Sequence, residues 1–170
     1  PLDLKASSSM YIAEFYFQNN DFEKALNGDG QYDGFLSISD EYSSTKSGNL
    51  ANYYAGICQI KLGEFENAIL SLKQFSINDE ILSSLSIGLI GDANMELGNT
   101  SKALANYKSA AVKNTNDFTT PYFMMKQANI HELNNDYNLA LELYNIIKSD
   151  YSQSKEALSI EKYISSVANR

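Results

Sequence analysis

Apolar residues recur at helical spacing through most of the chain. Residues 50 to 75 read LANYYAGICQIKLGEFENAILSLKQF, with apolar positions mostly at i, i+3 and i+4 on both sides of Gly63. This pattern predicts two helices joined by a turn. No stretch alternates apolar and polar residues between hairpin turns, as strands of a half-buried sheet would. The chain is therefore predicted to be all-α.

The helical pattern also repeats along the chain. Four segments superimpose without gaps: NNDFEKAL (19–26), LGEFENAI (62–69), LGNTSKAL (97–104) and NNDYNLAL (134–141). Their shared alanines, Ala25, Ala68, Ala103 and Ala140, lie 43, 35 and 37 residues apart. Two of the intervals are close to the ~34-residue period of a known helix-turn-helix repeat, and the first is longer by about eight residues.

Each repeated position has a physical reason. Glycine adopts the left-handed conformation at a helix end most easily, and asparagine tolerates it next best. The four turn positions hold these two residue types, as Asn20, Gly63, Gly98 and Asn135. Small residues midway in the first helix of each pair allow close helix packing, and these are Ala13, Gly56, Gly91 and Ala128. The residues after three of the turns, Asp21, Asn99 and Asp136, are predicted to cap the second helix.

These units resemble tetratricopeptide repeats (TPRs). The resemblance implies a right-handed superhelical solenoid of about four helix-turn-helix repeats in a single domain, residues 1–170. The repeats are expected at about 6–46, 49–80, 84–117 and 121–153, with Thr120-Pro121 as the N-cap and first turn of the first helix of the fourth repeat. A C-terminal capping helix is expected over 154–169, packing Ala157, Leu158, Ile160, Ile164 and Val167 on the last repeat.

The first repeat carries an insertion at 27–34, NGDGQYDG. We interpret it as a helix stop and turn, after which Asp33-Gly34 restarts the helix at 35–42. An alternative is a calcium-binding module over 29–40, because Asp29, Gln31, Asp33 and Asp40 fall at ligand positions of an EF-hand loop. Glutamine at the third position, the short Asp40 at the twelfth and the lack of a second loop weigh against it. No metal or other cofactor is expected.

Composition narrows the function. The 170 residues hold 21 acids, 13 bases and a net charge of −8, which disfavours binding to nucleic acid. The one histidine, His131, and the one cysteine, Cys58, are interpreted as structural residues, and no catalytic constellation is found, so the protein is predicted not to be an enzyme.

The TPR resemblance further implies a concave groove that binds a protein or peptide partner. Its predicted lining is Met10, Glu14, Phe17, Leu50, Tyr53, Ile57, Ile60, Asp92, Met95, Glu96, Tyr122, Met125, Asn129 and Glu132. This surface is apolar, rich in methionine and aromatic residues, and partly acidic, which favours a basic or neutral partner.

The interrupted first repeat, the segment YYAGICQIKLGEF, the segment DFTTP and the closing IEKYI resemble the membrane-anchored TPR proteins of Bacteroidota, which are similar to YfgM-type ancillary subunits of the Sec translocon. The resemblance implies a scaffold on the periplasmic face of the inner membrane, held by an N-terminal anchor upstream of Pro1. A soluble cytosolic TPR adaptor is the alternative. The sequence does not indicate an oligomeric state.

Overall fold

The computed structural model describes residues 2–168 and 170, and this part of the chain is helical without any strand. The helices are α1 (Leu2–Gln18), α2 (Phe22–Asn27), α3 (Phe35–Glu41), α4 (Lys46–Leu62), α5 (Phe65–Gln74), α6 (Glu80–Glu96), α7 (Thr100–Lys113), α8 (Thr119–Leu133), α9 (Tyr137–Asp150) and α10 (Ile160–Val167), with a 3₁₀ turn η1 (Glu156–Ser159). The all-α prediction is confirmed.

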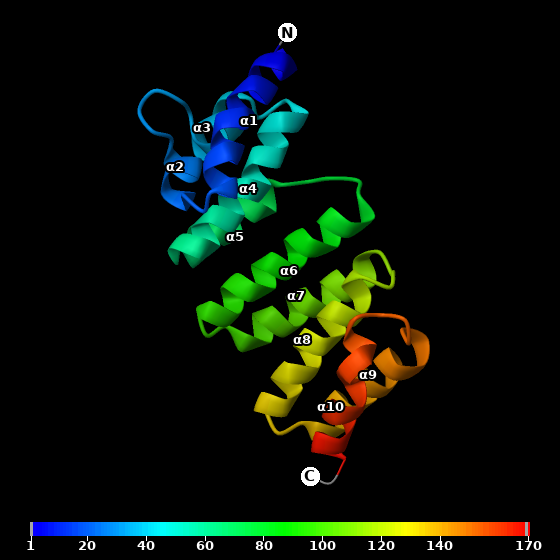
Figure 1. Ribbon diagram of the computed structural model, residues 1–170. Coiled ribbons are helices and arrows are strands. Elements are labelled where there is room, and N and C mark those ends of the chain that lie inside the picture. Colours follow the sequence, from blue (N-terminus) through cyan, green and yellow to red (C-terminus); the bar gives the residue numbers. More distant parts are fainter. Residues whose placement is uncertain (1, 169) are drawn as a thin grey trace. The chain divides into compact units, whose positions relative to one another are not determined.

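The chain divides into two compact units, Pro1–Ile77 and Asn78–Arg170. In the first, α4 packs against α1, α2, α3 and α5 (Figure 1). In the second, α6, α7, α8 and α9 each pack against the α-helix that follows in the chain (Figure 1). The single domain over residues 1–170 stays a prediction.

The same turn closes the first helix of all four pairs. Asn20, Gly63, Gly98 and Asn135 have φ of 60°, 81°, 74° and 62°, as predicted from their residue types. In each turn the following amide donates to the carbonyl five residues back, at 2.9 Å for Asp21 to Tyr16 and 2.8 Å for Glu64 to Gln59. The turn residue itself donates three residues back. This pair of bonds is the Schellman motif, which satisfies carbonyls at the helix end.

Close packing of the paired helices depends on the small residues that the sequence repeats. Ala25, Ala68, Ala103 and Ala140 are fully buried. A Cβ added to Gly56 of α4 would lie 2.5 Å from Leu72 Cγ of α5, and one on Gly91 of α6 would lie 2.6 Å from Tyr107 Cε1 of α7. Since nonbonded carbons prefer about 3.5–4.0 Å, these helix pairs leave no room for a methyl group.

The insertion interrupts the second helix of the first pair, as predicted. Helix α2 ends at Asn27, and α3 begins at Phe35 with Gly34 as its N-cap residue. The loop returns almost to its starting point, because a Cβ on Gly34 would lie 2.3 Å from the carbonyl oxygen of Leu26. Both α2 and α3 pack on α4. The inserted residues therefore divide the second helix into α2 and α3, and both pieces pack on α4.

Three details of the helix ends were predicted wrongly. Asp21 caps α2 by accepting the amide of Lys24 at 3.3 Å, but the Asn99 and Asp136 side chains make no capping bond. Thr120 lies inside α8, whose N-cap residue is Phe118, and the Asn116 side chain accepts the amides of Phe118 and Thr119 at this helix start. Asn116 reaches these amides because its own side chain is fixed by Asn114 and Thr119.

The C-terminal helix is shorter than predicted. Instead of beginning at 154, α10 begins at Ile160 after the η1 turn, and the predicted end at 169 falls outside the described residues. Ile160, Val167, Ala157 and Ile164 pack on the core with α9, as expected. Leu158 is 86% exposed, so its assignment to the apolar stripe was wrong. The 3₁₀ turn changes the angular register and directs Leu158 to solvent.

Candidate functional site

An apolar cleft of about 630 Å³ lies within the second unit. Its walls come from the first two turns of α6, the first turn of α8, the loop before α8, and residues 153–156, which lead from α9 into η1. The lining residues are Ile81, Leu85, Asp117, Phe118, Thr119, Tyr122, Gln153, Ser154, Lys155 and Glu156. Binding clefts commonly measure about 300–1,000 Å³ and are mainly apolar with a few polar groups, so this cleft has the size and character of a recognition site.

Large apolar side chains in the cleft are open to solvent. Phe118 is 75% exposed, and Ile81 and Tyr122 are about 40% exposed at 42% and 39%. Tyr122 is oriented by an edge-to-face contact with Phe123, whose ring centre lies 5.0 Å away. Exposed aromatic rings that are already held in place are typical anchors for a partner, because their burial yields much apolar area with little loss of side-chain freedom.

The loop that carries Phe118 is fixed by hydrogen bonds. Asn116 accepts the Phe118 amide at 2.9 Å and donates to the Asn114 carbonyl at 2.7 Å. Asn114 in turn donates to Ser83 Oγ of α6 at 2.9 Å. Thr120 Oγ1 donates to the Ala111 carbonyl at 3.0 Å and so ties α8 to α7. This rim of the cleft is therefore formed before any partner arrives.

The opposite rim is held in the same manner. Ser154 is buried, its amide donates to the Tyr151 carbonyl at 2.9 Å, and its Oγ accepts the Ala157 amide at 3.2 Å. These bonds fix the chain on both sides of Lys155 and Glu156, whose side chains line the cleft. The two rims frame an apolar floor with charged edges.

Of the predicted groove residues of the first unit, Met10 is buried and the others are partly buried. Met10 is only 4% exposed and belongs to the core, so its assignment to a groove surface was wrong. Phe17 packs edge to face on Tyr54 at 5.1 Å and on Phe35 at 6.2 Å between ring centres. Leu50 packs on the same core, and Tyr53 packs on Phe75. The partly buried Glu14, whose pKa burial raises, and the partly buried Ile57 and Ile60 complete this set.

In the second unit, the predicted groove residues do not gather at one site. Of them, only Tyr122 lines the apolar cleft. Asn129 and Glu132 line a second, more polar cleft of about 490 Å³ between α8 and α10, together with Leu133, Lys162, Tyr163 and Ser166. Met95 and Met125 are partly buried against the core, and Glu96 is exposed. Glu132 also accepts a hydrogen bond from Tyr144, which lies on α9.

Asp92 is not a free acid. It accepts hydrogen bonds from Tyr107 Oη and Lys126 Nζ, each at 2.6 Å, and so joins α6, α7 and α8. The Lys126 ammonium also lies 5.2 Å from the ring centre of Tyr122. Burial acts to lower the pKa of Lys126, but the bond to Asp92 and its charge outweigh it and raise that pKa. Burial and then Asp92 raise the pKa of Tyr107.

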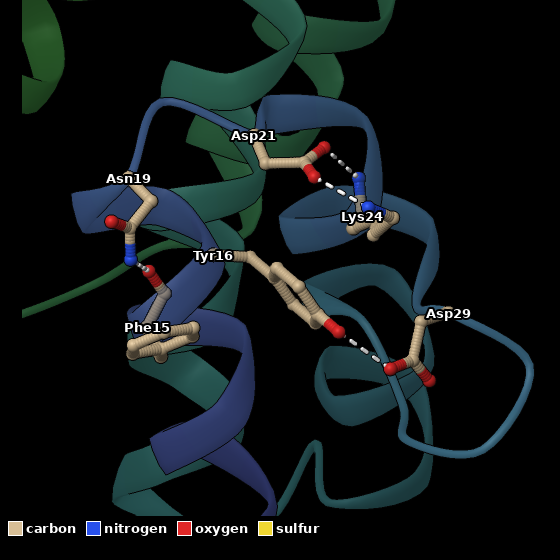
Figure 2. A network of polar contacts seen from close by, with 6 residues as sticks. All are labelled: Phe15, Tyr16, Asn19, Asp21, Lys24 and Asp29. Carbon is tan, nitrogen blue, oxygen red and sulfur yellow. Dashed lines mark hydrogen bonds and ion pairs between the residues drawn. The ribbon is translucent and has the colours of Figure 1, made fainter.

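The loop at 28–34 is organised by Asp29 (Figure 2). One Asp29 oxygen accepts the amides of Gln31 and Tyr32 at 2.9 and 2.8 Å, and the other accepts Tyr16 Oη at 2.6 Å. The Tyr16 bond, followed by the two amides, lowers the pKa of Asp29. Lys24 pairs with Asp21 at 2.8 Å nearby (Figure 2). The carboxylate that would open a calcium loop is therefore used to close the turn.

No group of three or more His, Cys, Asp or Glu side chains that could hold a metal occurs among residues 2–168 and 170. His131 Nδ1 lies 3.7 Å from Asp136 Oδ2, too far for a hydrogen bond, and the ring is largely enclosed. Cys58 is fully buried, and burial raises the pKa of its thiol to about 12. The interpretation of Cys58 as a buried apolar residue is confirmed.

Most lining residues of the apolar cleft were missed from the sequence. Leu85 could have been found, because it precedes Tyr122 by 37 residues, the same interval that separates Ala103 from Ala140. Phe118 and the 153–156 segment gave no such signal, since they lie in connections outside the repeating positions. Their approach to α6 is decided by packing that is distant in sequence.

No protein-family model matches the chain, and no curated protein matches it either. Among the helices that the structure describes, none combines the length and the apolar character needed to cross a membrane.

Proposed function

We propose that this protein is a non-enzymatic scaffold for protein–protein interaction, built from four TPR-type repeats in a right-handed superhelical array. The proposal is supported by four helix ends of the same Schellman geometry, each followed five residues later by a fully buried alanine. Tight helix pairs at Gly56 and Gly91 agree with the small-residue positions of that repeat. A repeat array of this kind offers extended surfaces rather than a reaction site.

The apolar cleft is the observation that most directly supports a binding function. The solvent-exposed side chains of Phe118, Tyr122 and Ile81 line one cleft whose rims are fixed by side-chain hydrogen bonds. A peptide that fills it would bury apolar area without ordering the loops, which removes one of the main costs of association. The partner is a polypeptide segment in an extended or helical form.

Panning a random peptide library against the purified chain tests this function. We expect enriched peptides with recurring apolar residues, and binding measured by fluorescence anisotropy that falls sharply for Tyr122→Glu. The matched control is Val112→Glu on α7, because Val112 is 66% exposed and does not line the cleft. A library without enriched peptides, or equal binding to both variants, would refute the scaffold proposal.

We further propose that the scaffold lies on the periplasmic face of the inner membrane, on the strength of the family resemblance alone. A soluble cytosolic adaptor remains the alternative. The gene sequence upstream of Pro1 distinguishes them: an apolar span of about 20 residues supports the anchored form, and a polar upstream sequence without such a span supports the adaptor.

A further inference from the structure

The charges around the apolar cleft are unequal. Asp117 and Glu156 line it, and Asp79 and Glu80 directly precede Ile81 at the start of α6. The one basic residue in the lining is Lys155. Two carboxylates and one ammonium therefore line the cleft, and two more acids lie next to one of its apolar lining residues in the sequence.

Among the described residues, none of these four acids is in an ion pair, although Asp79 accepts the amides of Ile81 and Leu82 at the start of α6. The ion pairs among the described residues join Lys24 to Asp21, Lys126 to Asp92 and Lys148 to Glu161, with a longer contact between His131 and Asp136. None of them includes an acid of the cleft. Residues 78–170 as a whole hold 8 bases and 11 acids, a net charge of −3, so the surroundings reinforce the local sign.

We propose that the cleft binds a cationic amphipathic polypeptide segment, with apolar side chains on the Ile81, Leu85, Phe118 and Tyr122 floor and lysine or arginine side chains at the acidic rim. This inference rests on the proposed scaffold function and names its partner class. Apolar contact supplies most of the affinity, while the charges select the sign of the partner and speed its approach. Asp117 and Glu156, together with the net negative charge of residues 78–170, repel anionic ligands, including nucleic acid and acidic lipid surfaces.

The ion pair between Lys126 and Asp92 removes one positive charge that an acidic peptide could otherwise bind. The Lys126 ammonium lies 5.2 Å from the Tyr122 ring centre, and it is already bonded to Asp92. Because that ammonium has a carboxylate partner and a neighbouring ring, it is not available to pair with an acidic peptide. Among the residues that line the cleft, Lys155 is therefore the one positive charge that could attract an acidic peptide.

Two fluorescein-labelled peptides of 14 residues test the inference. Both are built from leucine on one helical face, with lysine on the other face in one peptide and glutamate in the second. We expect the lysine peptide to bind at least about tenfold more tightly than the glutamate peptide, and its binding to weaken as salt is raised.

Charge-reversing variants identify the rim. Asp117→Lys combined with Glu156→Lys should weaken the lysine peptide by about tenfold or more. The matched control, Glu66→Lys with Glu142→Lys, changes the net charge equally at two exposed acids outside the cleft lining and should leave binding within about twofold. Phe118→Ser should also weaken binding, since it removes the exposed ring from the floor. Circular dichroism checks that every variant retains the wild-type helix content.

If the rim and control variants lost equal affinity for the lysine peptide, the peptide would be attracted by the net charge of the protein only, and the inference would be overturned. Tighter binding of the glutamate peptide would overturn it as well. In either case, library-selected peptides that still require Tyr122 would leave the scaffold function standing with a different partner chemistry. If neither the designed nor the selected peptides depend on Tyr122, both proposals fail.

Discussion

Replacing Gly63 by alanine isolates the energy of the left-handed turn. The residue has φ of 81°, and a Cβ added there would meet no atom within 4 Å. Since nothing crowds the new methyl group, the penalty comes from the backbone conformation alone, about 1–2 kcal/mol for an L-residue. With a urea dependence of roughly 2 kcal/mol per molar, the unfolding midpoint should fall by about 0.5–1 M.

The repeated turns supply the comparison series. Gly98, with φ of 74° and equally open surroundings, should respond to alanine in the same manner. Asparagine at Gly63 should have a smaller effect than alanine, because it tolerates this region better. Lys61→Ala, on the exposed last turn of α4, is the control. The assay is urea unfolding followed by far-ultraviolet circular dichroism, and a Gly63→Ala midpoint equal to that of wild type would refute the reasoning.

Three further outcomes are expected. Gly91→Ala should gain about 1 kcal/mol from helix propensity. Its Cβ would lie 2.6 Å from Tyr107 Cε1, so overpacking should cost about 1–3 kcal/mol, and we expect a net loss of stability and a lower Tm. An unchanged Tm would contradict the tight packing of α6 on α7. Because burial raises the pKa of Cys58 to about 12, its thiol should react with a disulfide reagent at pH ~8 far more slowly in the folded chain than in urea, and equal rates would contradict its burial. The Tyr16 bond lowers the pKa of Asp29, so the ionised carboxylate stabilises the fold above the unfolded-state pKa of ~3.9, and this stabilisation is lost as pH falls through the lower folded-state pKa. The Gln31 and Tyr32 amide resonances should therefore shift only below about pH 4. An inflection at higher pH would contradict the role of Asp29.

The insertion at 27–34 shows how local pattern and tertiary contact combine. Its sequence predicted a helix stop, a turn and a restart, and α2 and α3 confirm all three. The role of Asp29 was not predictable, because its second oxygen is bonded to Tyr16, thirteen residues earlier on α1 (Figure 2). An EF-hand spacing describes positions along a loop, whereas the donors that reach a carboxylate are decided by the helix packed beside it.

The sequence by itself determined the helices, the four turns and the close pairing at Gly56 and Gly91. These features depend on residues within one turn or one helical hairpin, where conformational preference and side-chain size act directly. The left-handed glycines and asparagines are the clearest example, since the residue type almost dictates the backbone angle.

Only the tertiary structure decided which side chains face a partner. Met10 and Phe17 stand at positions where the repeat predicts a surface, yet Met10 is buried in the core and Phe17 is partly buried against Tyr54. Phe118 stands in a connection outside the repeat, and bonds from Asn116 leave its ring at the cleft. Exposure is the sum of contacts from chain segments far apart in sequence, so a repeat pattern can place a helix face but cannot tell what covers it.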